Sequence, residues 1–195
     1  FRMMVPRGAT EASLYAYSES SQQALQEVAH SYAEPEFNTL IGELHSKTMP
    51  DSFSTGRTLG FDLKVRPVKR SRTKPNGKPR ERDAYQVEAM QHSASSETEI
   101  DFDREKVYLD WVAERFANNG AELCRDHHAK MTSFQRTQAI RRRAQRKGTE
   151  GPDAILQGQL TVTDSTLFQQ LLLKGVGRHC AYGYGMLLLR PPKRG

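Results

Sequence analysis

The stretch GVGRHCAYGYGMLLL, residues 175–189, decides how the rest of the chain is interpreted. Its first eleven residues include four glycines, which permit positive φ angles and a close approach of the backbone to a ligand. Arg178, His179 and Tyr182 supply a charge, a titratable ring and a stacking face. The apolar residues that follow, 186–189, are typical of a buried strand. The stretch therefore predicts a loop suited to holding phosphate, directly before a buried strand.

A helix is predicted immediately before this loop. Asp164 can cap residues 165–174, whose apolar side chains share one face, and Gly175 stands where a glycine commonly ends a helix. A dinucleotide-binding fingerprint is excluded because it follows a strand and opens a helix, and a Walker loop because no Gly-Lys-Ser/Thr ends the stretch. Two interpretations remain: a tight connection without a ligand, or a loop that holds the phosphates of a nucleic-acid backbone.

The positive charge of the chain is concentrated in two segments. The 195 residues carry a formal net charge of +6. Residues 57–82 contain ten Lys or Arg and two acids, and residues 136–147 contain six Lys or Arg and no acid. Residues 83–122, which lie between them, contain ten acids and three bases. Such segregation predicts a polyanionic partner.

Composition also limits the class of protein. Cys124 and Cys180 lack metal-ligand spacing, which favours free thiols in a cytoplasmic protein. The chain has neither a signal peptide nor an apolar run near the roughly 20 residues of a membrane span, so no membrane contact is expected. The adjacent His127 and His128 would point to opposite faces of a strand, so one metal site cannot easily use both. We expect neither a metal nor another cofactor.

The first part of the chain is predicted to contain few elements. Residues 1–5 and 13–18 suggest a hairpin, and residues 20–34 a helix that ends before a proline. A short helical piece near residues 37–44 and a short strand near residues 46–49 are expected to follow. Because the chain begins inside the predicted first strand with a residue other than Met, we expect its natural N-terminus to lie upstream.

Residues 57–70 contain the clearest strand. Alternate residues form an apolar and a polar set: Leu59, Phe61, Leu63 and Val65 on one face, and Asp62, Lys64 and Arg66 on the other. This strict period of two predicts one buried face and one wet, cationic face.

The remaining pattern predicts an α+β fold. After the strand come, in order, a basic loop (71–82), an acidic linker (91–99), a helix capped by Asp103, an irregular strand (121–134), a basic stretch (136–147), a strand (157–162), the final helix and a strand (184–190). Strand, helix, strand, strand, helix, strand is the order of a ferredoxin-like, RRM-like unit. We therefore expect tandem ferredoxin-like modules: a complete one in residues 57–195, and one lacking its initial strand and helix in residues 1–56.

The chain resembles the CasE (Cse3) family of type I-E CRISPR repeat endoribonucleases, which share tandem modules and a glycine-rich loop before the last strand. The segments that carry the resemblance are LKVRPVKR (residues 63–70), PNGKPRER (75–82), LTVTD (160–164) and the stretch 175–189. Arg66 stands where the family commonly has Asn, and Cys180 where it commonly has Lys.

The resemblance implies a function. It implies metal-independent cleavage of a CRISPR repeat at the 3′ base of its stem-loop, by attack of the upstream 2′-hydroxyl. It also implies that the product stays bound within the Cascade complex, so repeat RNA and other Cascade subunits are the expected partners. The family's catalytic His belongs to a helix that would precede Phe1, so no residue of this sequence inherits that role.

Candidate site residues follow from the loops and basic segments. Arg178 is expected to stabilise charge on the phosphorane, and His179 is the candidate acid or base, with an RNA contact or a solvated loop residue as the alternative. The expected RNA contacts, besides Arg178, are Gly175, Gly177, Tyr182, Arg66, Lys69, Arg70, Arg72, Lys74, Lys78, Arg80, Arg136, Arg141, Arg142 and Arg143.

Alternatives remain for the basic stretch and for the whole chain. Arg141, Arg142 and Arg143 suit a solvated charged face, but the lack of acids nearby favours a clamp on an RNA stem. The chain itself suits a non-catalytic subunit that holds a processed hairpin, or a general RNA-recognition protein. The aromatic RNP segment of the last class is missing from the predicted strands.

Overall fold

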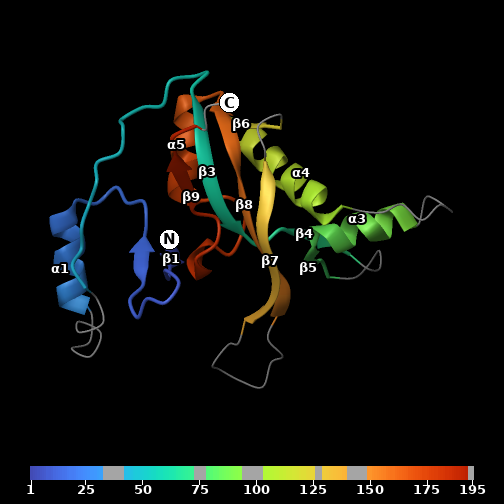
Figure 1. Cartoon of the computed structure of the whole chain (residues 1–195), viewed down its shortest axis with the longest axis horizontal. Helices are drawn as coiled ribbons and strands as arrows, with labels where there is room; N and C mark the ends of the chain where they lie inside the picture. The colour runs from blue at the N-terminus through green and yellow to red at the C-terminus, as the bar shows by residue number, and fades with distance from the viewer. Residues whose placement is uncertain (33–41, 73–77, 94–102, 126–128, 140–148, 193–195) are drawn as a thin grey trace.

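The computed structural model of the chain describes residues 1–32, 42–72, 78–93, 103–125, 129–139 and 149–192. A central antiparallel sheet is accompanied by helices and by two small hairpins (Figure 1). In chain order the elements are β1 (Arg2–Met4), β2 (Ser13–Tyr15), α1 (Gln22–Tyr32), β3 (Thr58–Val65), β4 (Val68–Ser71), β5 (Arg80–Asp83), α3 (Ala84–Ser93), α4 (Arg104–Ala117), β6 (Ala121–Cys124), β7 (Lys130–Ala139), β8 (Thr149–Val162), α5 (Ser165–Lys174), the 3-10 helix η1 (Cys180–Tyr182) and β9 (Leu187–Arg190). The expected mixed α+β character is confirmed.

The central sheet has five strands in the order β6-β8-β3-β9, with β7 also paired to β8. All pairings are antiparallel, and Leu63 of β3 lies opposite Leu156 of β8 and Leu187 of β9. Consequently β3 runs parallel to β6 with β8 between them, and β8 runs parallel to β9 with β3 between them. Since α4 lies between β3 and β6 in the chain and α5 between β8 and β9, the sheet contains two split β-α-β units.

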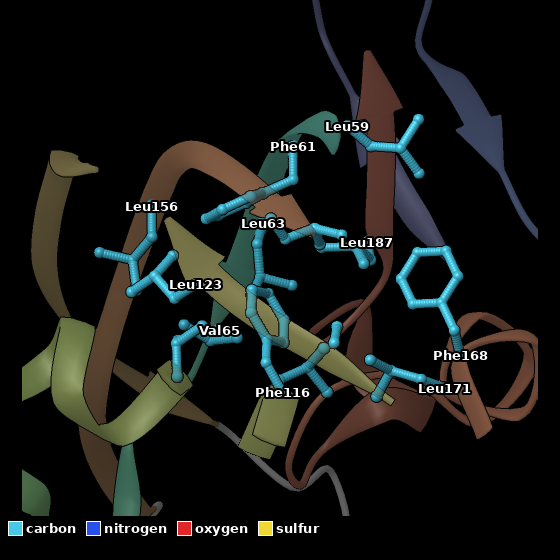
Figure 2. Close-up of a cluster of buried hydrophobic side chains, with 14 of the residues drawn as sticks. Leu59, Phe61, Leu63, Val65, Phe116, Leu123, Leu156, Phe168, Leu171 and Leu187 are labelled. Atoms are coloured by element: carbon cyan, nitrogen blue, oxygen red, sulfur yellow. The ribbon is translucent and has the colours of Figure 1, made fainter. Parts of the chain in front are cut away.

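The hydrophobic core lies where α4 and α5 pack against the apolar face of β3. Leu63 is fully buried there, and the rings of Phe61 and Phe116 meet edge to face with centroids 5.4 Å apart (Figure 2). Both helices start where their caps predict: Asp103 accepts a hydrogen bond from the Glu105 N–H, and Asp164 accepts one from the Leu167 N–H. The predicted buried face and both helices are therefore confirmed.

The opposite face of β3 is not the wet, cationic face expected from the sequence. Asp62 and Arg66 are 3% and 5% exposed. Asp62 binds Arg2, and it also accepts a hydrogen bond from Arg190 at 2.8 Å. Arg66 donates to the carbonyl and hydroxyl oxygens of Thr137 at 3.0 and 2.8 Å. The prediction was wrong because polar and charged side chains from other strands, rather than water, cover these groups.

The N-terminal segment contains the predicted hairpin, β1 with β2, and the predicted helix α1. Residues 42–56 contain neither helix nor strand, so the strand expected near residues 46–49 is wrong. The helical piece expected near residues 37–44 is also wrong at its end, because residues 42–44 are not helical. Residues 37–41 lie outside the described residues. Phe53 nevertheless joins the core, with its ring 5.1 Å from that of Phe168.

Two regions expected to lack regular structure contain some. The clearest predicted strand divides into β3 and β4, and β4 pairs with β5 at the end of the basic loop. The helix α3 follows directly and occupies part of the expected acidic linker. The irregular strand predicted over residues 121–134 is two strands, β6 and β7, and the last strand begins at Leu187 rather than Tyr184.

Candidate functional site

The glycine-rich loop is closed by its own backbone. The Val176 N–H donates to the Gly185 carbonyl at 2.8 Å, and the Gly185 N–H donates to the Lys64 carbonyl of β3 at 2.7 Å. Between them, His179 has φ 66°, a left-handed conformation that residues other than glycine seldom adopt. The loop is thus anchored to the centre of the sheet and holds its polar residues in a defined position.

The glycines of this loop are explained by contacts within the protein. A Cβ atom on Gly177 would lie 2.5 Å from the indole of Trp111, and one on Gly185 would lie 2.6 Å from the Val176 carbonyl oxygen. At Gly175 it would meet the Cys180 sulfur at 3.1 Å. Close approach to the protein itself therefore requires glycine at these positions, and an RNA contact at Gly175 or Gly177 remains a prediction.

A carboxylate joins this loop to the basic hairpin. Glu81 of β5 receives Arg178 Nε on Oε1 at 2.5 Å and His179 Nε2 on Oε2 at 2.8 Å. The side chain of Glu81 is 22% exposed, as is that of His179, whereas that of Arg178 is 49% exposed. Sequence reasoning missed Glu81. The available signal was that it is one of two acids in the basic segment 57–82.

A charged cleft of about 90 Å³ opens beside His179, between the glycine loop, the β4–β5 hairpin and the β7–β8 ribbon. Seven of its eleven lining residues are titratable or permanently charged, four basic and three acidic. The lining residues are Arg66, Val68, Glu81, Arg82, Asp83, Gln86, Arg136, Glu150, Gly151, Pro152 and His179.

The wall of the cleft near Asp83 is fixed by a buried polar network. Asp83 accepts hydrogen bonds from the Tyr108 hydroxyl at 2.8 Å and from Arg104 at 2.9 Å. Burial, reinforced by the Asp83 carboxylate, raises the pKa of Tyr108, so the phenol stays protonated and continues to donate. Arg104 also lies over the ring of Tyr85, 3.9 Å from its centroid. Asp83 is therefore occupied by structural partners.

The other predicted site residues are distributed unevenly around the cleft. Arg66 lines it but is buried, and Arg136 lines it while pairing with Glu150 at 2.7 Å. Lys69 pairs with Glu88. Tyr182 is 63% exposed on η1. The exposed basic residues of the hairpin and its flanks are Arg70, Arg72, Lys78 and Arg80. Lys74, Arg141, Arg142 and Arg143 lie outside the described residues.

Neither a metal-binding cluster nor a membrane-spanning helix is found among the described residues. Within the described ranges, no cluster of three or more His, Cys, Asp or Glu is arranged to hold a metal ion. His127 and His128 lie outside those ranges, and Cys124 and Cys180 are free thiols. In the part of the chain that the structure describes, every helix is too short or too polar to cross a membrane.

The fold is similar to those of solved CRISPR endoribonucleases. One is a Cse3 endoribonuclease bound to a 19-nucleotide RNA, with a TM-score of 0.52, 20% identity, and coverage of 74% of this chain and 59% of that one. A second is Thermus thermophilus Cse3 bound to an RNA representing a pre-cleavage complex, with a TM-score of 0.53, 20% identity, and coverage of 82% and 68%. A third is a chain of a CRISPR RNA-guided surveillance complex, with a TM-score of 0.50, 16% identity, and coverage of 77% of this chain and 66% of that one.

These similarities concern the fold, and the chain spans 59% of the length of the first of these structures. No curated protein sequence matches the chain. Residues 1–191 match the model of a family described as CRISPR associated protein. The resemblance drawn from the glycine-rich stretch and the basic hairpin is thus confirmed, and the chain belongs to the CRISPR-associated protein family.

Proposed function

We propose that this chain binds the stem-loop of a CRISPR repeat RNA, cleaves it at the 3′ base of the stem without a metal, and remains with the product as a Cascade subunit. The observation that carries the proposal is the position of Arg178 and His179, held together by Glu81 at the edge of a cleft that is also lined by three arginines. The similar folds of Cse3 endoribonucleases bound to RNA, and of a chain in a CRISPR RNA-guided surveillance complex, support it.

The fold proposed for this function is a pair of ferredoxin-like modules. The two split β-α-β units between β3 and β9 support a complete module in residues 57–195. The hairpin β1–β2 and the helix α1 support a partial module in residues 1–56. The basic hairpin β4–β5 and the ribbon β7–β8 extend from the complete module toward the cleft and would hold the RNA backbone.

In the proposed reaction, the upstream 2′-hydroxyl attacks the scissile phosphorus, and the 5′-oxygen leaves with a proton. The products are a 2′,3′-cyclic phosphate and a 5′-hydroxyl. Arg178 would stabilise the additional negative charge on the phosphorane, since a guanidinium donates to two phosphate oxygens at once. His179 would transfer one of the two protons.

One observation favours a second function, in which the chain holds the hairpin without cutting it. The Nε2 atom of His179 is already bonded to Glu81, so this nitrogen is not available to an RNA hydroxyl in the free protein. A hairpin-holding subunit would need Arg178 and the basic hairpin but no proton transfer by His179.

The test is to incubate the chain, in EDTA, with a CRISPR repeat hairpin from its host and with a scrambled hairpin, and to resolve bound from cleaved RNA. Cleavage at the stem base that His179→Ala abolishes supports the endoribonuclease. Tight, selective binding without cleavage supports the holding function. Equal binding of both hairpins would contradict both.

A matched pair of variants tests the site itself. Arg178→Ala should weaken binding of the repeat hairpin roughly tenfold or more, about 1.4 kcal/mol, because a charge-assisted phosphate contact is lost. Arg125→Ala is the control, since Arg125 is also an exposed arginine in an ion pair, with Asp110 at 2.6 Å, but does not line the cleft. Equal effects would remove the glycine loop from the RNA-binding surface.

A further inference from the structure

The ion pairs of Glu81 use both oxygens of one carboxylate. Oε1 is 2.5 Å from Arg178 Nε, and Oε2 is 2.8 Å from His179 Nε2. Two donors from consecutive residues therefore converge on a pair of oxygens that belong to a single planar anion. The left-handed backbone of His179, φ 66°, is part of the conformation that presents these neighbouring side chains together.

Glu81 differs in its partners from the other two acids that line the cleft: Asp83 is held by Tyr108 and Arg104, and Glu150 pairs with Arg136. The basic segment 57–82 contains two acids, Asp62 and Glu81. Asp62 is buried against Arg2 and Arg190, on the polar face of β3. Glu81 is partly exposed, stands between Arg80 and Arg82 in the sequence, and lines the cleft. It thus places a negative charge where the surrounding residues would attract an anion from solvent.

A phosphate satisfies the same donors as this carboxylate. Guanidinium and imidazole N–H groups bind carboxylate and phosphate oxygens with similar geometry. Space for a larger anion exists next to Glu81, because the cleft of about 90 Å³ is bounded by Glu81 and His179. Arg66, which is 5% exposed, lines the same cleft, and its Nε has no hydrogen-bond partner among the described residues.

We propose that Glu81 is an internal substitute for phosphate: in the free protein it occupies an anion site formed by Arg178 Nε and His179 Nε2, and a bound phosphate group displaces it. The inference rests on the proposed RNA-binding function and identifies one phosphate site within it. No covalent bond is made or broken in the exchange. The released carboxylate turns toward solvent, and its two donors pass to the phosphate oxygens.

This exchange would make binding selective. An isolated phosphate must compete with a carboxylate that is already in place, whereas an RNA that also contacts the basic hairpin gains enough elsewhere to displace it. A repulsive element of this kind raises discrimination while it lowers affinity. Neutralising Glu81 should therefore strengthen the binding of RNA, whereas changing a residue in a binding site usually weakens it.

The first test compares Glu81→Gln with Glu114→Gln, which removes the same charge from an exposed residue of α4 that does not line the cleft. The dissociation constant of the repeat hairpin is measured over a series of salt concentrations. Glu81→Gln should bind about three- to tenfold more tightly and show a steeper salt dependence, by about one phosphate contact. Glu114→Gln should match the wild type. Weaker or unchanged binding by Glu81→Gln would overturn the inference.

The second test does not depend on RNA. Inorganic pyrophosphate is titrated into wild-type protein and into Glu81→Gln, while the imidazole signals of His179 are followed by NMR and assigned with His179→Gln. The wild-type signals should shift at high pyrophosphate, and those of Glu81→Gln at severalfold lower concentration. Adding Arg178→Ala to Glu81→Gln should abolish this gain. If His179 does not respond in either protein, the anion site is refuted.

The two tests separate the inference from the function on which it rests. A wild-type chain that fails to prefer the repeat hairpin, but shows the pyrophosphate response and its enhancement by Glu81→Gln, would contradict the proposed function and retain the anion site for another phosphate ligand. A chain that binds the hairpin selectively, with Glu81→Gln weaker than wild type, would retain the function and reduce Glu81 to a structural link between two loops.

Discussion

The two faces of β3 differ in chemistry, and both are largely buried, although the Lys64 side chain on the polar face is 33% exposed. On one face, Leu63 is fully buried beneath helices, in a core of apolar side chains. On the other, Asp62 and Arg66 are almost as inaccessible, but they are covered by charged and polar groups from other strands. Alternation in a sequence therefore indicates which kind of partner each face of a strand requires. It does not report whether that partner is solvent.

The polar face imposes a stricter condition than the apolar one. Apolar burial is roughly proportional to area and tolerates changes of shape. A buried carboxylate instead needs opposite charge and hydrogen bonds at defined positions, because desolvation of an ion is costly. At Asp62 these come from Arg2, Arg190 and Gln157.

The largest effect is expected on the polar face. Asp62→Ala should lower the free energy of unfolding by about 3–5 kcal/mol, because the almost fully buried Arg2 would keep its charge without a partner. Urea denaturation measures this change. Asp110→Ala is the control, since the exposed pair of Asp110 with Arg125 should contribute within about 1 kcal/mol. Equal losses would mean that solvent reaches Asp62.

The apolar face should respond nearly as strongly. Leu63→Ala should lower the free energy of unfolding by about 2–5 kcal/mol, because the lost transfer free energy is added to that of a cavity among packed side chains. Leu173→Ala, at a leucine that is 47% exposed on α5, should change it by about 0.5 kcal/mol or less. If Leu63→Ala lowered the free energy of unfolding far less than Asp62→Ala, the two faces would also differ in how much they contribute to stability.

A smaller effect on stability is expected where the glycine loop contacts α4 at Trp111. Gly177→Ala combines a positive φ of 82° with a clash against Trp111, and should destabilise the protein by about 1–3 kcal/mol. Gly8→Ala separates the two causes, because Gly8 has φ 79° but no neighbouring atom within 4 Å of a Cβ. Thermal unfolding should show a greater loss for Gly177→Ala. Equal losses would assign the whole effect to φ.

The smallest effect concerns reactivity within the same loop. Burial raises the pKa of the Cys180 thiol, so less thiolate is present at a given pH in the folded protein than in the unfolded chain. In a Cys124→Ser background, the rate of alkylation of Cys180 by iodoacetamide should reach half its maximum at a higher pH when the protein is folded than in denaturant. Coincident profiles would show that Cys180 is freely hydrated.

The parts of the fold that sequence predicts best depend on neighbouring residues. The caps Asp103 and Asp164 act on N–H groups two and three residues further on, and both helices begin where these residues predict. The helix α3 was missed because its apolar residues, although they make up half of it, do not gather on one face. The strand expected near residues 46–49 had only a weak pattern to support it, and the structure has none there.

In the candidate site, too, the residues marked by a local pattern were predicted and those with partners far away in the sequence were not. Arg178 and His179 were found because a cluster of glycines marks their loop within eleven residues. Glu81 was missed because its pairing spans almost a hundred residues of sequence, and a period-of-two pattern carries no information about such a partner. Arg66 was expected in solvent because its partner, Thr137, is 71 residues away in the sequence and the pattern of β3 alone does not indicate it.

The place of β3 at the centre of the sheet also has a consequence for the folding of the nascent chain. Thr58–Val65 is synthesised before both of its neighbours in the sheet, Thr149–Val162 and Leu187–Arg190. One edge of this strand therefore waits unpaired while the 83 residues between β3 and β8 are translated, and the other edge while the 121 residues between β3 and β9 are translated. Pairings of such high sequence separation fold slowly, and unpaired edges favour aggregation meanwhile. Slower translation would prolong this exposure.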